Sequence, residues 1–256
     1  MVRLKRAMTK HESVVMAPLL ALEHVSKNFG ALKVIDDLSL AVDAGEALGI
    51  LGPNGAGKTT LFNLVTGDLP VSAGTIRYRG QDVTRLPNHA RCRLGIGRSY
   101  QIPHPFANMT VFENVLAGAA FGAGKREAEC HDRCVALLEQ THLLKKANQP
   151  AGTLTLLERK RLELARALAT EPSLLLLDEI AGGLTDSECL ELIETIRAVH
   201  AAGIAIVWIE HIVHALIAVV GRLLVINFGQ TLAEGPPDRV MADAAVQEVY
   251  MGIEGE

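Results

Sequence analysis

Three features that would mark other classes of protein are missing from this sequence of 256 residues. The formal net charge is -4, whereas broad nucleic-acid binding requires a basic face, so we expect no nucleic-acid partner. No run of eighteen apolar residues occurs, which is about the length a transmembrane helix needs, so we expect no membrane span. The 4 cysteines are scattered without a disulfide framework, which favours a reducing compartment over a secreted, disulfide-stabilised scaffold.

The N-terminus resembles a secretory signal without matching one. The basic stretch MVRLKRAMTK precedes a short apolar run, VVMAPLLAL. That run contains a proline and continues into EHVSKNFG without a good small-residue cleavage site. We therefore interpret residues 1–17 as a flexible N-terminal extension and residues 18–256 as the folded domain.

Segments typical of strands and of helices alternate along the domain, which predicts an α/β fold around a parallel sheet. The apolar runs at 173–179 and 204–210 are typical of strands buried on both faces. Two segments near the N-terminus, LLALEHV and VIDDLSLAV, alternate like strands of an antiparallel layer. A mainly helical pattern at about 102–170 predicts an inserted helical lobe.

The segment GPNGAGKTT matches the phosphate-binding motif G-x-x-x-x-G-K-[ST] and lies between a strand-like run and a helix-like run. Glycines let successive backbone N–H groups surround an anion, and the helix N-terminus adds its positive dipole end. Lys58 can reach the β- and γ-phosphates of a nucleotide, and the Thr59 hydroxyl can bind Mg²⁺. The predicted phosphate-binding residues are Gly52, Pro53, Asn54, Gly55, Ala56, Gly57, Lys58, Thr59 and Thr60.

Acidic residues and a histidine follow two of the apolar runs. Asp178 is placed to hold Mg²⁺ through water, and Glu179 to orient or deprotonate an attacking water. His211 follows IVWIE, and a lone histidine is more often structural than functional. Because ligands bind at the carboxyl ends of parallel strands, we nevertheless predict Lys58, Asp178 and His211 at one edge of the sheet.

With these motifs the chain resembles the ATPase subunits of ATP-binding cassette (ABC) transporters over nearly its whole length. The resemblance includes RSYQ, NFGALKVIDDLSL, LLLLDE and EH. It implies a P-loop NTPase parallel sheet core with an antiparallel β subdomain and an inserted helical subdomain, and ATP and Mg²⁺ as ligands. For single residues it implies an adenine contact from Phe29 and a flexible-loop glutamine at Gln101, which joins Thr59 and Asp178 at the metal. It also implies catalysis by Glu179 with His211 as the switch histidine.

Within that family, the segments GIGRSYQIPHPFANMTVFENV, ANQPAG and VYMG are most similar to ATPase subunits of branched-chain amino acid importers. The resemblance implies a cytoplasmic subunit, peripheral on the inner face of the cell membrane, that works with integral-membrane permease subunits and indirectly with a solute-binding protein. ATP would lie between the phosphate loop of one ATPase subunit and the signature segment of a second. An ATPase subunit of a urea or amide importer, or a nucleotide-gated interaction module with little hydrolysis, remains an alternative.

The segment LTLLE stands where the family has its signature, Leu-Ser-Gly-Gly-Gln. Leu154 is retained and Thr155 keeps the hydroxyl, but Leu156, Leu157 and Glu158 replace both glycines and the glutamine. Thr155 and Glu158 also have capping-box spacing, which needs no ligand. We expect Glu158 to turn back onto its own helix, because a partner-bound phosphate would repel it. This divergence favours pairing with a different ABC ATPase subunit, with a homodimer as the alternative.

Overall fold

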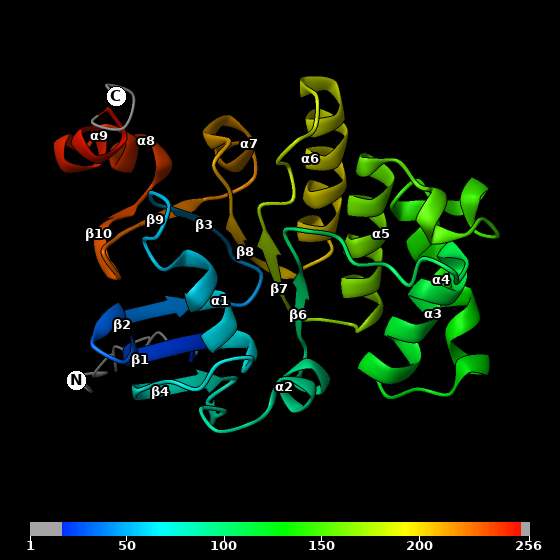
Figure 1. Ribbon diagram of the computed structural model, residues 1–256, viewed down its shortest axis with the longest axis horizontal. Helices are drawn as coiled ribbons and strands as arrows, with labels where there is room; N and C mark the ends of the chain where they lie inside the picture. The colour runs from blue at the N-terminus through cyan, green and yellow to red at the C-terminus, as the bar shows by residue number, and fades with distance from the viewer. Residues whose placement is uncertain (1–16, 252–256) are drawn as a thin grey trace, which may run out of the picture.

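The computed structural model of the chain describes residues 17–251. Residues 1–16, nearly all of the predicted extension at 1–17, lie outside the described residues, as do residues 252–256. Within the described part, a parallel-stranded sheet, a smaller antiparallel sheet and a group of helices lie side by side (Figure 1). This arrangement confirms the predicted fold class.

The central sheet has six strands in the order β10-β9-β3-β8-β7-β6, and only β10 runs antiparallel to its neighbour. Leu174 and Leu176 contribute to the core on one face of this sheet, whereas Leu175 and Leu177 contribute to the core on the other face. Burial on both faces explains the uninterrupted apolar run in the sequence. The strands are β3 (Ala47–Leu51), β6 (Ile96–Ser99), β7 (Leu174–Asp178), β8 (Ala205–Ile209), β9 (Arg222–Asn227) and β10 (Gln230–Gly235).

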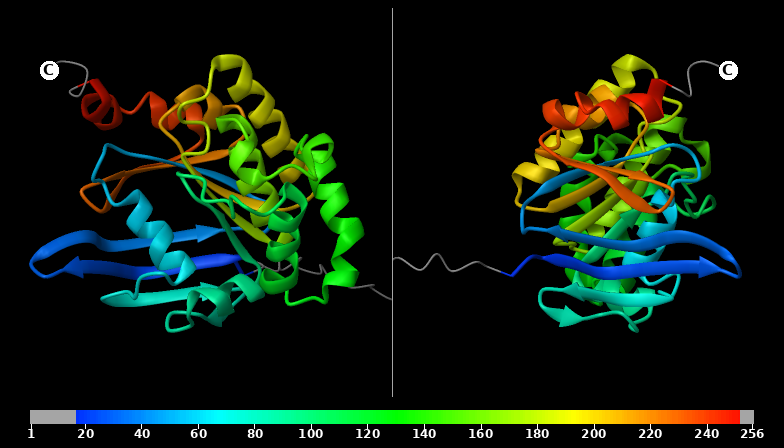
Figure 2. Two further views of the ribbon diagram at one scale, coloured as in Figure 1. Left: turned by 45° about the vertical axis from the view of Figure 1, so that its right-hand side comes forward. Right: turned by 90° about the vertical axis from the view of Figure 1, so that its left-hand side faces the viewer.

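The antiparallel sheet has the order β2-β1-β4-β5 and packs across helix α1 (Lys58–Thr66) from the central sheet (Figures 1 and 2). Leu61 and Phe62 of α1 are buried in one core with residues of both sheets. Helix α1, which follows the phosphate loop, is therefore packed between the two sheets. This packing fixes the direction of its first turn. The strands are β1 (Leu20–Phe29), β2 (Leu32–Val42), β4 (Ala73–Tyr78) and β5 (Gln81–Asp82).

Most of the remaining helices pack on the other face of the central sheet, and those between residues 111 and 169 form the lobe on the right of Figure 1. Helix α2 and strand β6 lie in a stretch where the sequence patterns predicted no element. Among the described residues, no helix has the length and apolar character required to cross a bilayer. The helices are α2 (Asn88–Leu94), α3 (Val111–Ala117), the π-helix η1 (Gly118–Gly122), α4 (Glu127–Gln140), the short 3₁₀ turns η2 (Leu144–Lys146) and η3 (Ala151–Thr153), α5 (Leu156–Ala169), α6 (Asp186–Ala201), α7 (Val213–Ile217), α8 (Pro237–Met241) and α9 (Ala244–Met251).

Three of these helices begin with the same local device, a capping box. In each box, a threonine hydroxyl accepts a bond from the backbone N–H three residues later, and a glutamate at that later position accepts one from the threonine N–H. Helix α1 begins differently: its N-cap is Gly57, and no side chain caps it. The boxes are Thr110 with Glu113 at α3, Thr155 with Glu158 at α5, and Thr185 with Glu188 at α6.

Candidate active site

One cavity of about 600 Å³ collects most of the predicted site residues at the carboxyl ends of the parallel strands. This is the edge at which open α/β sheets bind ligands. The phosphate loop supplies one wall, and residues that follow β6, β7 and β8 supply the other. The lining residues are Leu32, Val34, Asn54, Gly55, Ala56, Gly57, Lys58, Thr59, Thr60, Gln101, Glu179 and His211.

Two glycines of the phosphate loop are required by its close contact with neighbouring strands. At Gly57, φ is +103° and an added Cβ would lie 2.7 Å from the carbonyl oxygen of Val34. At Gly52, an added Cβ would lie 2.3 Å from the carbonyl oxygen of Ile226. Neither position has room for a side chain, so the loop can follow this path only with glycine. The path leads into α1, whose first N–H groups have no side-chain cap and remain available to an anion.

Lys58 is held inside the loop that precedes it. Its side-chain Nζ donates to the carbonyl oxygens of Gly52 at 2.7 Å and Pro53 at 3.0 Å. Burial lowers the pKa of Lys58. An ammonium group has three N–H donors, so two bonds to the loop leave one for a further acceptor. Gly52 and Pro53, which do not line the cavity, thus contribute through the carbonyl groups that orient Lys58.

Glu179 is in contact with two other predicted residues. His211 Nε2 lies 2.8 Å from its Oε1, and Gln101 Nε2 donates to its Oε2. The Glu179 backbone is in the left-handed region, with φ at +48°, and its N–H donates to the carbonyl of Ile209 at 2.9 Å. The carboxylate is therefore fixed at both oxygens beside the phosphate loop. Gln101, a predicted metal ligand, contacts Glu179 here.

Asp178 lies beneath the cavity and is almost fully buried. Its Oδ2 accepts a bond from Arg98 Nη2 at 2.8 Å, whereas no described residue is bonded to its buried Oδ1. Burial raises the pKa of Asp178, and Arg98 opposes that effect. A buried oxygen without a partner suits a hard cation that prefers oxygen ligands, and Lys58 at the start of α1 is near enough to influence the pKa of Asp178. The donor set therefore fits Mg²⁺, with Thr59, Gln101 and Asp178 as the residues that would hold it.

Phe29 lies at the end of β1, opposite Leu32 of β2, which lines the cavity. Its ring is half exposed and lies under the ammonium of Lys27, 5.0 Å from the ring centroid. Leu32 and Val34 are the residues of this hairpin that reach the cavity itself. An adenine contact from Phe29 stays a prediction.

Sequence reasoning missed a buried pair of charges under the cavity. Glu210 accepts bonds from the backbone N–H of Ala181 at 3.0 Å and of His211 at 3.1 Å. Lys160 on α5 donates to the carbonyl oxygen of Glu179 at 3.4 Å. Burial raises the pKa of Glu210 and lowers that of Lys160. Glu210 had a signal in the sequence, because it ends an apolar run just as Asp178 and Glu179 do; Lys160 had none.

The five residues of the divergent signature segment lie away from the cavity, at the start of α5. The capping box confirms that Glu158 turns back: its Oε2 accepts from the Thr155 N–H at 3.0 Å, and its Oε1 pairs with Lys146 Nζ at 2.5 Å. Burial works against ionisation here, but the bonds from Lys146 and Thr155 outweigh it and lower the pKa of Glu158. Leu154 and Leu157 are buried, and Leu156 is exposed beside Gly183.

The glycine loop, the lysine within it and the fixed carboxylate beside it define a P-loop ATPase. Residues 35–182 match the family described as "ABC transporter", and the chain belongs to the ATPase subunits of this family, which hydrolyse ATP. Residues 230–256 match a second family, described as "Branched-chain amino acid ATP-binding cassette transporter".

Similar proteins include two curated subunits and two solved structures. The lipopolysaccharide export system ATP-binding protein LptB of Escherichia coli K12 is 35% identical over 237 residues, covering 93% of this chain and 98% of that protein. The high-affinity branched-chain amino acid transport ATP-binding protein LivG of Salmonella typhimurium is 36% identical over 250 residues, covering 92% and 98%. A nucleotide-free ATP-binding cassette and one in its ADP conformation superpose with TM-scores of 0.83 and 0.84, each 30% identical and covering 91% of this chain and 98% of theirs.

Proposed function

We propose that this subunit powers an importer of branched-chain amino acids. The observation that carries the proposal is the match of residues 230–256 to the branched-chain amino acid cassette family, which lies outside the region shared by ABC ATPases in general. The 36% identity to LivG over nearly the whole chain supports it. The subunit would act on the cytoplasmic face of the cell membrane, bound to permease subunits that receive cargo from a solute-binding protein.

The charged and polar side chains of the site have roles that their contacts support. Lys58 and the N–H groups at the start of α1 hold the β- and γ-phosphates. Glu179 accepts a proton from the attacking water, while His211 and Gln101 hold its two oxygens in place. Bound Mg²⁺, held by Thr59, Gln101 and Asp178, would neutralise charge that develops on the phosphates.

A second candidate function is export. LptB is nearly as similar as LivG, at 35% identity, and its name assigns it to lipopolysaccharide export. An importer of urea or amides is a further alternative, because the cytoplasmic ATPase does not contact the cargo. A nucleotide-gated module with little hydrolysis is disfavoured by Glu179, whose two oxygens are held at the phosphate loop in the manner a general base requires.

The test is transport by the complete assembly. The complex would be purified from its native membrane through this subunit, its permease and binding protein identified, and the set reconstituted in vesicles. We expect accumulation of labelled leucine that depends on ATP and disappears in Glu179→Gln. Accumulation of labelled urea without leucine would establish the urea alternative, and extraction of lipopolysaccharide from the vesicles would establish export.

A further inference from the structure

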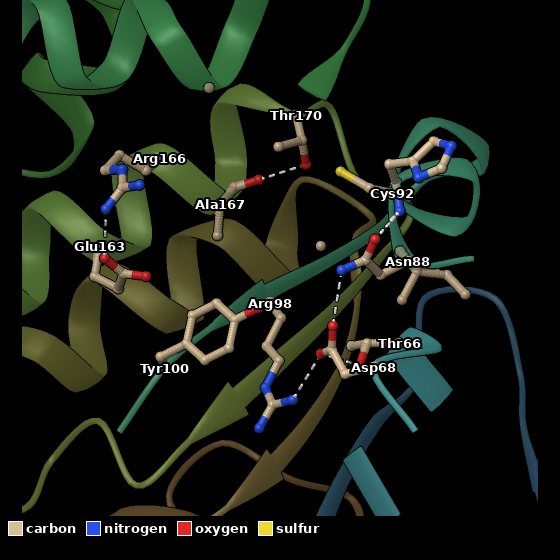
Figure 3. A pocket seen from close by; sticks show the side chains of 14 residues that line it. Thr66, Asp68, Asn88, Cys92, Arg98, Tyr100, Glu163, Arg166, Ala167 and Thr170 are labelled. Atoms are coloured by element: carbon tan, nitrogen blue, oxygen red, sulfur yellow. Dashed lines mark hydrogen bonds and ion pairs between the residues drawn. The ribbon is translucent and has the colours of Figure 1, made fainter. Parts of the chain in front are cut away.

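Arg98 on β6 lies between the ATP cavity and a second, surface cavity. The surface cavity has a volume of about 320 Å³, and its walls include Asp68, Tyr100, Glu163 and Arg166 (Figure 3). Arg98 lines it beside Tyr100, yet only 6% of the Arg98 side chain is exposed. The guanidinium group therefore extends inward, toward the end of β7.

The guanidinium is fixed from several directions. Nη2 donates to Asp178 Oδ2 at 2.8 Å, and Nη1 donates to Asn63 Oδ1 on α1 at 2.6 Å. The ring centroid of Tyr100 lies 4.7 Å from the guanidinium carbon of Arg98, and the ring centroid of Phe62 lies 5.7 Å from it. Both distances are within the range of cation–π contact. Because the group is planar and donates in fixed directions, these contacts leave it little freedom to turn.

The two carboxylate oxygens of Asp178 therefore have different surroundings. Oδ2 is committed to Arg98, and Oδ1 is buried without a partner among residues 17–251. Without Arg98, the carboxylate could rotate about its χ2 bond, which has no strong preference of its own. Arg98 thus determines which oxygen is left for another ligand.

We propose that Arg98 is a positioning residue: it holds Asp178 so that Oδ1 is presented to the Mg²⁺ that accompanies ATP. The inference rests on the proposed role of Asp178 as a metal ligand and adds the residue that makes this ligand effective. Asn63 extends the same linkage to α1, the helix whose first turn carries Lys58 and Thr59.

Arg91 provides a matched control. It is even more buried than Arg98, at 1% exposure, and donates only to backbone carbonyl oxygens, among them those of Leu64, Leu86 and Thr84. Its contacts join α1, α2 and the turn before α2, and no carboxylate is bonded to it in the described chain. Substituting Arg91 removes a buried arginine without touching Asp178, which separates loss of stability from loss of positioning.

The experiment measures nucleotide binding by the full chain, with a fluorescent ATP analogue titrated in EDTA and then at increasing Mg²⁺. In Arg98→Met we expect affinity in EDTA to change less than twofold and the Mg²⁺ midpoint to rise at least tenfold. Arg98→Lys should recover part of that shift. Arg91→Lys should lower the melting temperature and leave the midpoint unchanged. A midpoint in Arg98→Met that is unchanged or lower overturns the inference.

Asp178→Asn distinguishes failure of the inference from failure of the metal assignment. If Asp178→Asn leaves the Mg²⁺ midpoint unchanged, Asp178 is not a metal ligand and both ideas fail. If it raises the midpoint while Arg98→Met does not, only the positioning role fails. In the Asp178→Asn background, Arg98→Met should add less than a twofold shift, because in a double-mutant cycle residues that act through one contact are not additive.

Discussion

The N-termini of α1 and α5 start from the same local problem, because the first N–H groups of any helix lack partners within it. At α1 the N-cap is Gly57, no acidic residue lies in the first turn, and no side chain bonds to the free N–H groups. At α5, Thr155 and Glu158 close a capping box and Lys146 pairs with Glu158. The N–H groups at the start of α1 are left open to an anion, whereas at the start of α5 side chains of the same helix start bond to the backbone.

This difference identifies α5 as a helix start of the ordinary kind. The same device begins α3 and α6, at sites where the sequence predicts no ligand. In the usual family signature, which LTLLE replaces, Ser and Gln keep the capping-box spacing, but glycines in place of Leu156 and Leu157 would leave the backbone N–H groups between them uncovered by side chains. We infer that the α5 end offers a nucleotide on a neighbouring subunit a weaker contact than α1 offers its own. The predictions below test each half of this comparison.

The largest effect is expected at the α1 side, where Glu179 faces the phosphate loop. Glu179→Gln keeps the shape of the side chain and removes the base, so turnover by the assembled transporter should fall about 100-fold or more, while Mg²⁺-ATP binding persists. Phosphate release and nucleotide titration measure the two effects. Glu188→Gln, which alters only the capping box of α6, is the control and should retain turnover. Undiminished phosphate release in Glu179→Gln would exclude Glu179 as the base.

The next prediction compares Lys58, in the first turn of α1, with Lys146, the partner of Glu158 at the start of α5. Lys58→Ala should weaken ATP binding at least tenfold, equivalent to about 1.4 kcal/mol, because the loop loses its ammonium group. Lys146→Ala removes the partner of Glu158 at α5 and should leave ATP affinity of the isolated chain unchanged. Titration of both variants with a fluorescent nucleotide measures the two affinities. Equal affinities for Lys58→Ala and the parent would refute the assignment of Lys58 as the phosphate anchor.

The sequence predicted the α1 side well because its evidence is local. The glycines, Lys58 and the apolar runs around them can be read in order along the chain, and the parallel sheet brings their ends together. The contacts that fix Asp178 and Glu179 could not be read in this way. Arg98 and Lys160 are charged residues that become informative only when the fold places them under Asp178 and Glu179. Pairings between residues distant in sequence need the fold itself.

At α5 the sequence predicted the local structure and missed one tertiary contact. The spacing of Thr155 and Glu158 was sufficient to predict the capping box and the return of Glu158, since both partners lie within one turn. Lys146 belongs to the earlier turn η2, and no pattern linked it to Glu158. Strand β6 was missed for a related reason: with only four residues and Gly97 among them, it has too short an apolar run to indicate a strand.

The third prediction concerns the two leucines and the carboxylate at the start of α5. Replacing LTLLE by LSGGQ should raise ATPase activity or ATP-dependent dimerisation of the isolated chain about fivefold, equivalent to ~1 kcal/mol, of the order of one hydrogen bond. Leu156→Gly with Leu157→Gly, keeping Glu158, separates the effect of the glycines from that of the carboxylate. Melting temperatures must accompany both, because Leu157 is buried. If the restored segment brings no gain in a folded chain, the signature does not limit activity, and the case for a mixed pair of ATPase subunits is lost.

The smallest effect concerns stability alone and tests whether α5 begins like α3. Thr155→Ala removes the hydroxyl that accepts the Glu158 N–H bond, so the free energy of unfolding should fall by about 1 kcal/mol, the usual cost of losing such a cap. Thr110→Ala removes the equivalent bond at α3 and should cost a similar amount. Urea denaturation measures both, and Thr155→Ser should restore most of the loss. Because neither threonine lines the ATP cavity, nucleotide affinity of the isolated chain should stay the same in all three variants. A Thr155→Ala chain of undiminished stability would show that the capping box contributes nothing at α5. The N–H groups there would then be as open as those of α1, and the distinction between the two helix ends would disappear.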